Sequence, residues 1–445
     1  MSKAALDSLL STELPSVGEY DVIVCGAGPA GLGAAIAAAR GGAKVLLVER
    51  AFYVGGMSTA TGINCWCDTP GGAIFDELEA RVGKLGKASR RFDPQGYLWE
   101  KGRVTLHGET VKAVALKMVL EAGAEVLFGT VAARALVDSG SVRSVVLANK
   151  GGLSLACLRV VIDCTADADV AASAGARFLK GDPEDGRLMH VNFMFSLGGV
   201  DLEKAQREAL PDERVVGLLR EAHRRGELHA PHGAFRPRPE VFPYHPPEGC
   251  LILNYWEIEG VDASDPLAVS ATVAECQVIA LEVVEFCRGN LPGYEKCEIS
   301  RFWDVLGTRE SRRVVGLYEL TREDVLAGRK FEDGVARACF FIDFHDSPPG
   351  RSIPYDLAFK RRNSPPPGDW YEIPYRCLVP ESVQGMLVAG RCISADRSAL
   401  ASLRVMPTCM FTGQAAGTAA ALAVAAGLKP HEVDAREVRA RLLAD

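Results

Sequence analysis

A glycine-rich turn between two apolar segments constrains the fold of this protein more than any other feature of its sequence. Residues 21–25 form a short apolar run, and Gly26-Ala-Gly28-Pro-Ala-Gly31 follows it directly. The alanine-rich residues 29–40 predict a helix, and a second apolar run, 44–48, comes next. The order strand, glycine turn, helix, strand predicts the βαβ unit that binds dinucleotides.

Each glycine of this turn has a physical role in such a unit. Gly26 makes the tight turn, Gly28 lets the backbone approach a pyrophosphate, and Gly31 lets the helix pack on the strand. The helix start at Pro29-Ala30 offers N–H groups and a partial positive charge to phosphates. Glu49, at the end of the second strand, can accept hydrogen bonds from both ribose hydroxyls. A ligand-free glycine turn is the alternative, but the strand, helix and acid together favour a dinucleotide.

The residues that follow Glu49 indicate which dinucleotide this is. Arg50 comes first, and Gly55-Gly56-Met57-Ser58-Thr59 lies a few residues on. Here the sequence resembles the superfamily of two-dinucleotide-fold flavoproteins, in which a Gly-Gly pair carries the chain along the pyrophosphate to the isoalloxazine ring. The resemblance implies FAD, bound through these residues. Relatives in the fumarate reductase and succinate dehydrogenase group often have a histidine next, for covalent attachment. Met57-Ser58-Thr59 stands here instead, so we expect non-covalent FAD.

Three alternating apolar runs follow, 131–137, 142–147 and 153–162, and predict an antiparallel meander. The resemblance places a backbone contact with adenine at Thr130-Val131. The last run leads into Asp163-Cys-Thr165-Ala166-Asp167, where flavoproteins of this type usually carry Ala-Thr-Gly-Asp near the FAD phosphates. Thr165, Ala166 and Asp167 are therefore expected to bind FAD, with Ala166 in place of the usual glycine. An acidic surface turn is the alternative.

The C-terminal region carries the most specific part of the resemblance. Residues 385–390 predict a strand that ends at Gly390, and Arg391 stands where many flavoproteins have an acid. A long Ala/Gly helix is predicted to begin near Pro407, with Thr408 and Met410 in its first turn. A helix N-terminus facing the flavin would stabilise the negative charge that reduction places there. Arg391 is expected to contact either phosphate or substrate.

Most of the sequence resembles FAD-dependent oxidoreductases near the fumarate reductase flavoproteins. The fold this implies is α/β: a Rossmann-like FAD-binding domain of the glutathione-reductase type, made of residues 18–187 and 376–445. Residues 188–375 carry no second glycine fingerprint. They are predicted to form an inserted, β-rich α+β substrate or cap domain, with a strong helical pattern at 267–288.

Four residues are candidates for the chemistry. His345, in Ile-Asp-Phe-His-Asp, is the leading candidate for the proton step, and a structural histidine is the alternative. Fumarate reductase-like enzymes use arginines in places comparable to Arg309 and Arg404 to hold a carboxylate and to deliver a proton. An ion-pair network within residues 309–313 is the alternative for Arg309. Tyr375 is a candidate general acid or a packing residue.

The function expected is an FAD-dependent oxidoreductase, a dehydrogenase or oxidase. It would dehydrogenate a polar small molecule at a C–OH or C–N carbon by hydride transfer to flavin N5. The alternative is fumarate reductase-like reduction of an activated C=C bond, with arginine as the acid. An alternative of another class is an FAD-containing nucleotide-binding or RNA-modification partner.

The composition of the chain limits which binding partners and which cellular compartment can be expected. The net charge of −7 argues against a phosphate-backbone binder, so no nucleic acid is expected. The 13 cysteines are scattered, and no second pair or nearby histidine completes a metal site at Cys65 and Cys67. Residues 408–427 are of membrane length, but their Ala/Gly content and Gln414 predict a buried helix and no membrane span.

The first twenty residues have no long apolar core, so no secretory signal is expected and the protein is predicted to be cytoplasmic. The expected partners are a small-molecule substrate, an electron acceptor of unknown kind and, in a homo-oligomer, further copies of the chain.

Overall fold

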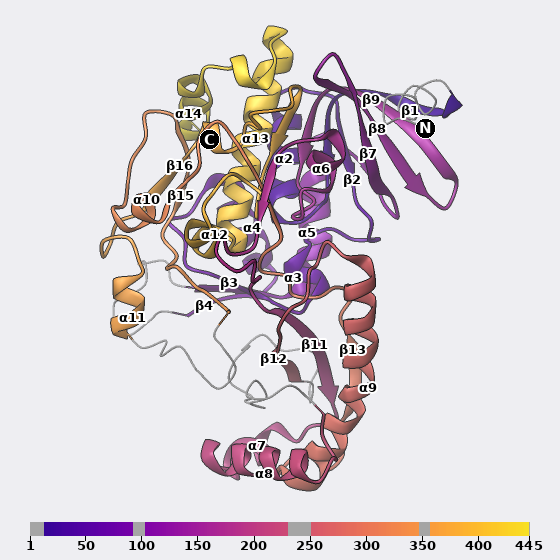
Figure 1. Cartoon of the computed structure of the whole chain (residues 1–445), viewed down its shortest axis with the longest axis vertical. Helices are drawn as coiled ribbons and strands as arrows, with labels where there is room; N and C mark the ends of the chain where they lie inside the picture. Colours follow the sequence, from indigo (N-terminus) through magenta and orange to yellow (C-terminus); the bar gives the residue numbers. More distant parts are fainter. Residues whose placement is uncertain (1–12, 92–102, 230–250, 347–356, 445) are drawn as a thin grey trace.

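A seven-stranded sheet lies at the centre of the computed structural model, which describes residues 13–91, 103–229, 251–346 and 357–444 (Figure 1). The strand order is β6-β2-β1-β9-β8-β7, with β17 beside β9. The strands are β1 (Ser16–Cys25), β2 (Val45–Val48), β6 (Glu125–Leu127), β7 (Val131–Asp138), β8 (Ser141–Asn149), β9 (Gly152–Asp163) and β17 (Met386–Val388).

One half of this sheet is parallel and the other half is the predicted meander. Strand β1 runs parallel to β2 and to β9, and β2 runs parallel to β6. The first part of β9 pairs antiparallel with β8, whereas Val161–Asp163 pair in parallel with Met386–Val388 of β17. The parallel, Rossmann-like α/β core is thereby confirmed, and β9 joins it to the meander.

Two helices far apart in sequence, α2 (Pro29–Arg40) and α13 (Met406–Ala426), pack with their backbones in close approach (Figure 1). A Cβ atom at Gly33 would lie 2.3 Å from the carbonyl oxygen of Met410. A Cβ atom at Gly413 would lie 1.9 Å from the carbonyl oxygen of Ala30. Because any side chain at these glycines would separate the helices, the predicted buried, closely packed helix is confirmed.

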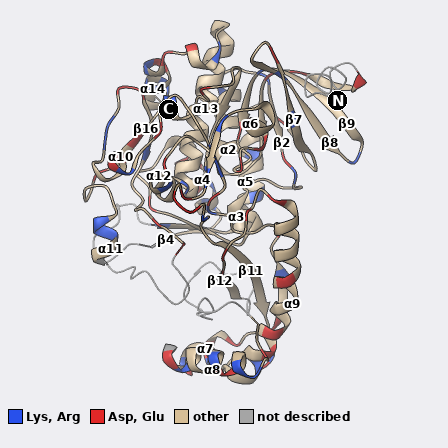
Figure 2. Ribbon diagram, viewed as in Figure 1, with Lys and Arg blue, Asp and Glu red and all other residues tan. Residues whose placement is uncertain are grey.

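A second hydrophobic core lies below the first in Figure 1. A three-stranded sheet, β12-β11-β13, packs against the long helix α9, and α7 and α8 extend from the far end. Figure 2 shows basic and acidic residues interspersed along the ribbons of α7 and α8. The elements are β11 (Val191–Gly198), α7 (Leu202–Arg207), α8 (Asp212–Arg224), β12 (Leu251–Ile258), α9 (Pro266–Asn290) and β13 (Glu298–Phe302).

The two cores divide the chain differently from the predicted boundaries. Buried residues of the second core run from Val191 to Leu306, whereas Val314, Ile342 and Tyr371 already belong to the first core. Thus only part of 188–375 forms the separate core. The expectation of a β-rich insertion is also corrected, because long helices such as α9 dominate the described part of that range.

The remaining elements surround the two cores. They are α3 (Met57–Ala60), β3 (Cys65–Trp66), α4 (Ala73–Lys84), β4 (Ala88–Arg91), β5 (Arg103–Leu106), α5 (Gly108–Glu121), α6 (Asp169–Ala174), β10 (Phe178–Lys180), β14 (Arg312–Val314), α10 (Arg322–Leu326), β15 (Gly334–Ala338), α11 (Leu357–Arg362), β16 (Tyr371–Pro374), α12 (Arg397–Leu403) and α14 (Ala435–Ala444), with short 3-10 turns at Tyr375–Cys377 and Pro430–Glu432.

Two helices of the described part, α9 and α13, are long and apolar enough to cross a membrane by length and composition alone. Helix α13 is mostly buried against α2 and the sheet. Helix α9 buries one face, including Ile279, Val283 and Cys287, in the second core. Helix α13 therefore packs as a core helix, whereas only 33% of the apolar window of α9 is buried. The prediction of no secretory signal rests largely on residues 1–12, which lie outside the described residues.

Candidate functional site

The three glycines of the turn after β1 differ in what surrounds them. Gly26 has a φ of +97°, and a Cβ atom there would lie 2.6 Å from the carbonyl oxygen of Cys164. A Cβ atom at Gly31 would lie 1.7 Å from the carbonyl oxygen of Gly26. Both glycines are required by packing within the protein itself. A Cβ atom at Gly28, by contrast, would meet only Gly56 Cα, at 3.8 Å. The space in front of Gly28 is therefore open to a ligand.

The Gly55-Gly56 pair lies directly against this turn. The Gly55 amide donates to the carbonyl oxygen of Ala27 at 2.8 Å, and a Cβ atom at Gly56 would lie 2.6 Å from Gly28 Cα. Ser58 and Thr59 are buried, and their hydroxyl groups donate to backbone carbonyls of residues 54–56. These two hydroxyls hold the loop in shape, and half-buried Met57 begins the short helix α3.

Glu49 lies at the end of β2, as predicted, and its carboxylate faces the glycine turn. One carboxylate oxygen accepts from the Ala27 amide at 2.6 Å, and the other accepts from the Ala51 amide at 2.8 Å. Each oxygen retains a second lone pair for a further donor such as a ribose hydroxyl. The Thr130 amide donates to the Glu49 carbonyl oxygen at 3.0 Å, which places exposed Val131 beside this strand end.

The turn after β9 is organised by Asp163, a residue that is fully buried. Its carboxylate accepts from the Thr165 amide and hydroxyl, at 3.0 and 2.6 Å, and from the Ala171 amide at 2.7 Å. Ala166 and Ala168 both adopt left-handed backbone, with φ of +69° and +55°. Such backbone is costly for residues with a Cβ atom. The buried carboxylate of Asp163 and the left-handed backbone of Ala166 and Ala168 argue against the alternative interpretation, an acidic turn on the surface.

Asp167 joins this turn to the strand end of β17. Its Oδ1 accepts from Arg391 Nη2 at 2.6 Å and from Ser311 Oγ at 2.5 Å. Burial raises the pKa of Asp167, but the charge of Arg391 and these hydrogen bonds outweigh it and leave the pKa lowered, with exposed Arg50 adding to the effect. Arg391, which is buried, is therefore occupied by an ion pair within the protein.

The start of α13 meets the glycine turn of α2. Gly390 has a φ of +87°, and a Cβ atom there would lie 2.9 Å from Ala30 Cβ. Pro407, Thr408 and Met410 are buried in the first turns of α13, which no side chain caps.

Arg404 lies just before this helix, and its Nε is buried with no hydrogen-bond partner among the described residues. A buried donor of this kind marks a place for an acceptor from a bound group. Together with the open space at Gly28 and the carboxylate of Glu49, it fits a flavin dinucleotide.

Five ionisable side chains, among them Arg404, meet between the two cores, and we call them the carboxylate–histidine cluster. His345 lies at its centre, with Nδ1 2.6 Å from Glu257 Oε1 and Nε2 3.1 Å from Asp343 Oδ2. Arg309 Nη2 donates to Glu257 Oε1 at 3.1 Å, and Arg404 Nη2 donates to Asp343 Oδ2 at 3.2 Å. Each carboxylate is thus shared between the imidazole and one arginine.

Both carboxylates of the cluster are held in their charged form. Burial raises the pKa of Asp343, but His345 and Arg404 outweigh it and bring the pKa to about 2. Burial also raises the pKa of Glu257, but hydrogen bonds from His190 and His345 and the charge of Arg309 outweigh it and leave the pKa lowered. Each ring nitrogen of His345 thus faces a charged carboxylate oxygen, to which it can donate when it carries a hydrogen.

The structure brings three of the four predicted catalytic residues together, namely His345, Arg309 and Arg404. Tyr375 is placed elsewhere: it is buried, and its hydroxyl donates to the carbonyl oxygen of Pro430 at 2.7 Å. Sequence reasoning missed Glu257 and Asp343. The available signal was an acidic residue in the apolar run of β12 and another two positions before His345.

An ion-pair network is present among residues 310–313, as the alternative interpretation expected, but Arg309 is not part of it. Glu310 is buried, accepts from Arg313 Nη1 at 2.6 Å, and accepts from Arg397 Nε at 3.0 Å. Arg312 pairs with Asp169 at 2.9 Å. Arg313 and Arg312 therefore serve the packing of the protein, whereas Arg309 reaches the cluster.

The fold and these two sites define an oxidoreductase that uses a flavin dinucleotide, and the comparison with known families agrees. A family model described as FAD dependent oxidoreductase matches residues 21–442. The chain belongs to the FAD-dependent oxidoreductase family, is an enzyme of this type, and uses FAD as its cofactor.

Curated relatives match shorter regions. Digeranylgeranylglycerophospholipid reductase 1 of Methanopyrus kandleri is 36% identical over 152 residues, 32% of this chain and 39% of the relative. Thiamine thiazole synthase of Methanococcus aeolicus is 33% identical over 165 residues, 35% of this chain and 58% of the relative. The chain therefore spans less than two thirds of the length of either.

Among solved structures, a geranylgeranyl bacteriochlorophyll reductase-like protein of Thermoplasma acidophilum aligns with 96% of this chain and 83% of its own. The TM-score is 0.47 and the sequence identity is 13%.

Proposed function

We propose that this enzyme dehydrogenates a polar small molecule at a C–OH or C–N carbon, with the carboxylate–histidine cluster handling the proton. Bound FAD supplies the acceptor for the hydride. The observation that carries the proposal is the position of His345 between two charged carboxylates, one of which, Asp343, also binds Arg404 just before the uncapped start of α13. We further propose that FAD is held non-covalently by the glycine turn, the Gly55-Gly56 loop, Glu49 and the start of α13.

The proton that the substrate releases decides which protonation state of the cluster can be active. A substrate hydroxyl or amine loses a proton as the hydride leaves its carbon, so His345 must have a free lone pair to accept that proton. A ring that carries hydrogen on both nitrogens must lose one of these protons before it can act as this base. Dehydrogenation should therefore be faster at higher pH.

A second candidate is reduction of an activated C=C bond, and the placement of two potential proton donors, His345 and Arg404, on the same carboxylate of Asp343 favours it. Such a reaction needs a proton donor at the carbon that does not receive the hydride, and His345 or Arg404 could donate it. The relative from Methanopyrus kandleri is named as a reductase, which supports keeping this candidate. Reduction should be faster at lower pH, the opposite of dehydrogenation.

Anaerobic flavin spectroscopy separates the two candidates. The oxidised enzyme is mixed with a panel of sugars, hydroxy acids and amino acids, and loss of the flavin absorbance bands is followed between pH 5 and pH 9. The photoreduced enzyme is mixed with fumarate-like alkenes over the same pH range. Bleaching that rises with pH supports dehydrogenation, whereas reoxidation that rises as the pH falls supports reduction. The dehydrogenase proposal fails if no compound bleaches the flavin while an alkene reoxidises it.

A further inference from the structure

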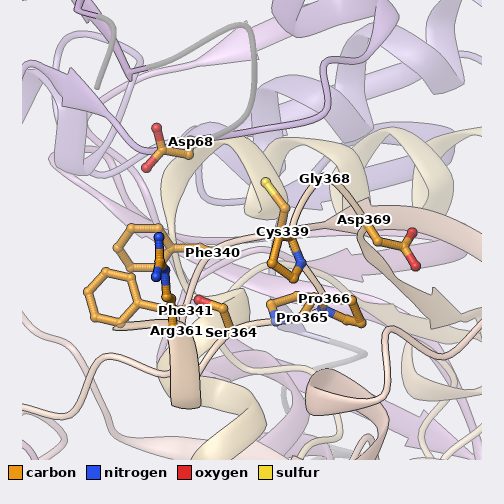
Figure 3. A pocket seen from close by; sticks show the side chains of 11 residues that line it. Asp68, Cys339, Phe340, Phe341, Arg361, Ser364, Pro365, Pro366, Gly368 and Asp369 are labelled. Carbon is orange, nitrogen blue, oxygen red and sulfur yellow. The ribbon is translucent and has the colours of Figure 1, made fainter. Parts of the chain in front are cut away.

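A small cavity lies beside the segment that leads to the carboxylate–histidine cluster (Figure 3). Asp68, Phe340, Phe341, Arg361 and Pro366 are among the residues that line it. Its volume is about 40 Å³, which is room for a few water molecules, since each needs roughly 10–15 Å³. The cavity can therefore take one small polar group of a larger molecule and cannot hold a ring.

Asp68 is a buried polar group of this cavity that lacks a full set of partners. Its side chain is 3% exposed, and Oδ1 has no hydrogen-bond partner among the described residues. The other oxygen, Oδ2, lies 3.4 Å from Arg103 Nε. Leaving a buried carboxylate oxygen unpaired is costly, so the arrangement is typical of a site that receives a donor from outside the protein.

The cavity adjoins the proposed reaction site. Phe340 and Phe341 pack with Cys67 and Val405 in one hydrophobic cluster, and Val405 is the residue that precedes α13. The same segment reaches Asp343 two residues after Phe341. Burial raises the pKa of the Cys67 thiol to about 12, and the charge of Asp343 adds to the shift. Asp68, the neighbour of Cys67, therefore lies close to the carboxylate–histidine cluster.

The charges around Asp68 select the kind of donor. Burial raises the pKa of Asp68, while the positive charges of Arg103 and Lys360 oppose this effect. Arg361 lines the cavity as a further cation. An ammonium group would be attracted by Asp68 but repelled by these three cations, and a carboxylate would face the unpaired oxygen of Asp68. A neutral hydroxyl group meets neither penalty.

We propose that Asp68 Oδ1 accepts a hydrogen bond from a substrate hydroxyl group, so that the substrates are polyhydroxylated molecules or hydroxy acids rather than amino acids. The identification of this ligand with the substrate rests on the proposed function. The hydroxyl site itself rests on the cavity, the burial of Asp68 and its unpaired oxygen. The hydroxyl bound here is distinct from the reacting one, because His345, Glu257 and Asp343 are not among the residues that line the cavity.

The test uses three probes that share a three-carbon chain: 1-propanol, propylammonium chloride and sodium propionate. Their binding to the FAD-loaded enzyme is measured by saturation-transfer-difference NMR, without turnover. We expect 1-propanol to bind most tightly. Asp68→Asn should weaken 1-propanol about fivefold, the factor for one hydrogen bond of about 1 kcal/mol. In that variant the amide oxygen faces Arg103 and the amide nitrogen faces the cavity, so propionate should bind better than to the natural enzyme.

Asp369→Asn is the matched control, because Asp369 lines the same cavity but pairs with Lys330 at the surface. It should leave all three affinities unchanged, and the flavin absorbance of both variants should report an intact fold. The proposal is overturned if propylammonium or propionate binds the natural enzyme best, if no probe binds, or if Asp68→Asn changes nothing. If 1-propanol behaves as expected but no hydroxyl compound bleaches the flavin, the hydroxyl site stands and the proposed dehydrogenation fails.

Discussion

His345 Nδ1 lies 2.6 Å from Glu257 Oε1, although the two residues are 88 positions apart in sequence. Glu257 is carried by β12 of the second core, whereas His345 follows Ile342 of the first core. The contact therefore depends on how the two cores are placed, and any shift between them changes the surroundings of the imidazole.

Replacing Glu257 by Gln should alter the pH dependence of flavin bleaching or reoxidation. A neutral amide holds a protonated imidazole less strongly than a carboxylate does, so the inflection of the rate profile should move to lower pH. We also expect the rate to fall by roughly 10²-fold, the lower range for loss of acid–base function. Stopped-flow absorbance between pH 5 and pH 9 measures both effects.

Glu259→Gln serves as the control for this variant, since Glu259 is exposed and lies 3.8 Å from His190 Nε2, outside the cluster. Its profile should match that of the natural enzyme. An unchanged profile for Glu257→Gln would show that His345 takes no part in the proton step.

Gly28→Ala should weaken FAD binding and leave the fold intact. Among the described residues, the new Cβ atom would meet nothing closer than 3.8 Å, and the φ of Gly28 is −70°, which alanine adopts freely. We expect FAD affinity to fall at least tenfold, about 1.4 kcal/mol, because the methyl group occupies the space left for the pyrophosphate. Flavin fluorescence titration measures the affinity. Unaltered FAD affinity would contradict the proposed contact.

Gly31→Ala should have the opposite pattern, with loss of the fold as the primary effect. Its Cβ atom would lie 1.7 Å from the carbonyl oxygen of Gly26, a distance that the backbone can relieve only by moving. We expect the free energy of unfolding to fall by about 3 kcal/mol or more, measured by urea denaturation of the cofactor-free protein. A variant as stable as the natural protein would show that α2 does not pack as described.

Asp343 should make stability depend on pH in the acid range. Its pKa in the folded protein is about 2, below the ordinary value of 3.8, so its contribution is full above about pH 4 and is lost as the pH falls towards 2. The shift corresponds to about 2 kcal/mol. Asp343→Asn should be less stable than the natural protein at pH 5, and the difference should shrink by about this amount at pH 2. Urea denaturation at the two pH values measures it, and a constant difference would contradict the ion pairs with His345 and Arg404.

Ala166→Gly should stabilise the protein. Alanine at a φ of +69° costs about 1–2 kcal/mol that glycine does not incur, while glycine adds about 0.5–1 kcal/mol of backbone entropy loss. We expect a net gain of up to about 1 kcal/mol in the free energy of unfolding. Ala171→Gly, inside helix α6, is the comparison and should destabilise by about 1 kcal/mol. A destabilised Ala166→Gly variant would show that the left-handed turn is unstrained.

The nucleotide unit was largely predictable from sequence because its determinants are local. The glycine turn, the Pro29–Arg40 helix and the three meander runs each carry their own pattern within a short stretch, and the structure has the elements at these positions. The position of Glu49 at a strand end followed from the same unit. The close approach of α2 and α13 was expected only in general terms, from the glycines of the last helix.

The carboxylate–histidine cluster was predictable only in part. His345, Arg309 and Arg404 were chosen by residue type and by the resemblance, but nothing local distinguishes Arg309 from Arg313, which is buried on Glu310 instead. Glu257 and Asp343 are two of the 57 acidic residues, and their selection depends on the packing of one core against the other. The sequence pattern around Tyr375 fits a packing residue as well as it fits a general acid. In the structure Tyr375 is buried, as a packing residue would be.

The pairing of α2 with α13 has a consequence for how this protein comes into being on the ribosome. The helix whose backbone α2 must touch is translated almost four hundred residues after α2 itself. Until then, the face of α2 that carries Gly33 has no native partner. Folding of the nucleotide unit must wait until α13 has been synthesised, which leaves that apolar surface exposed to chaperones or to aggregation in the meantime.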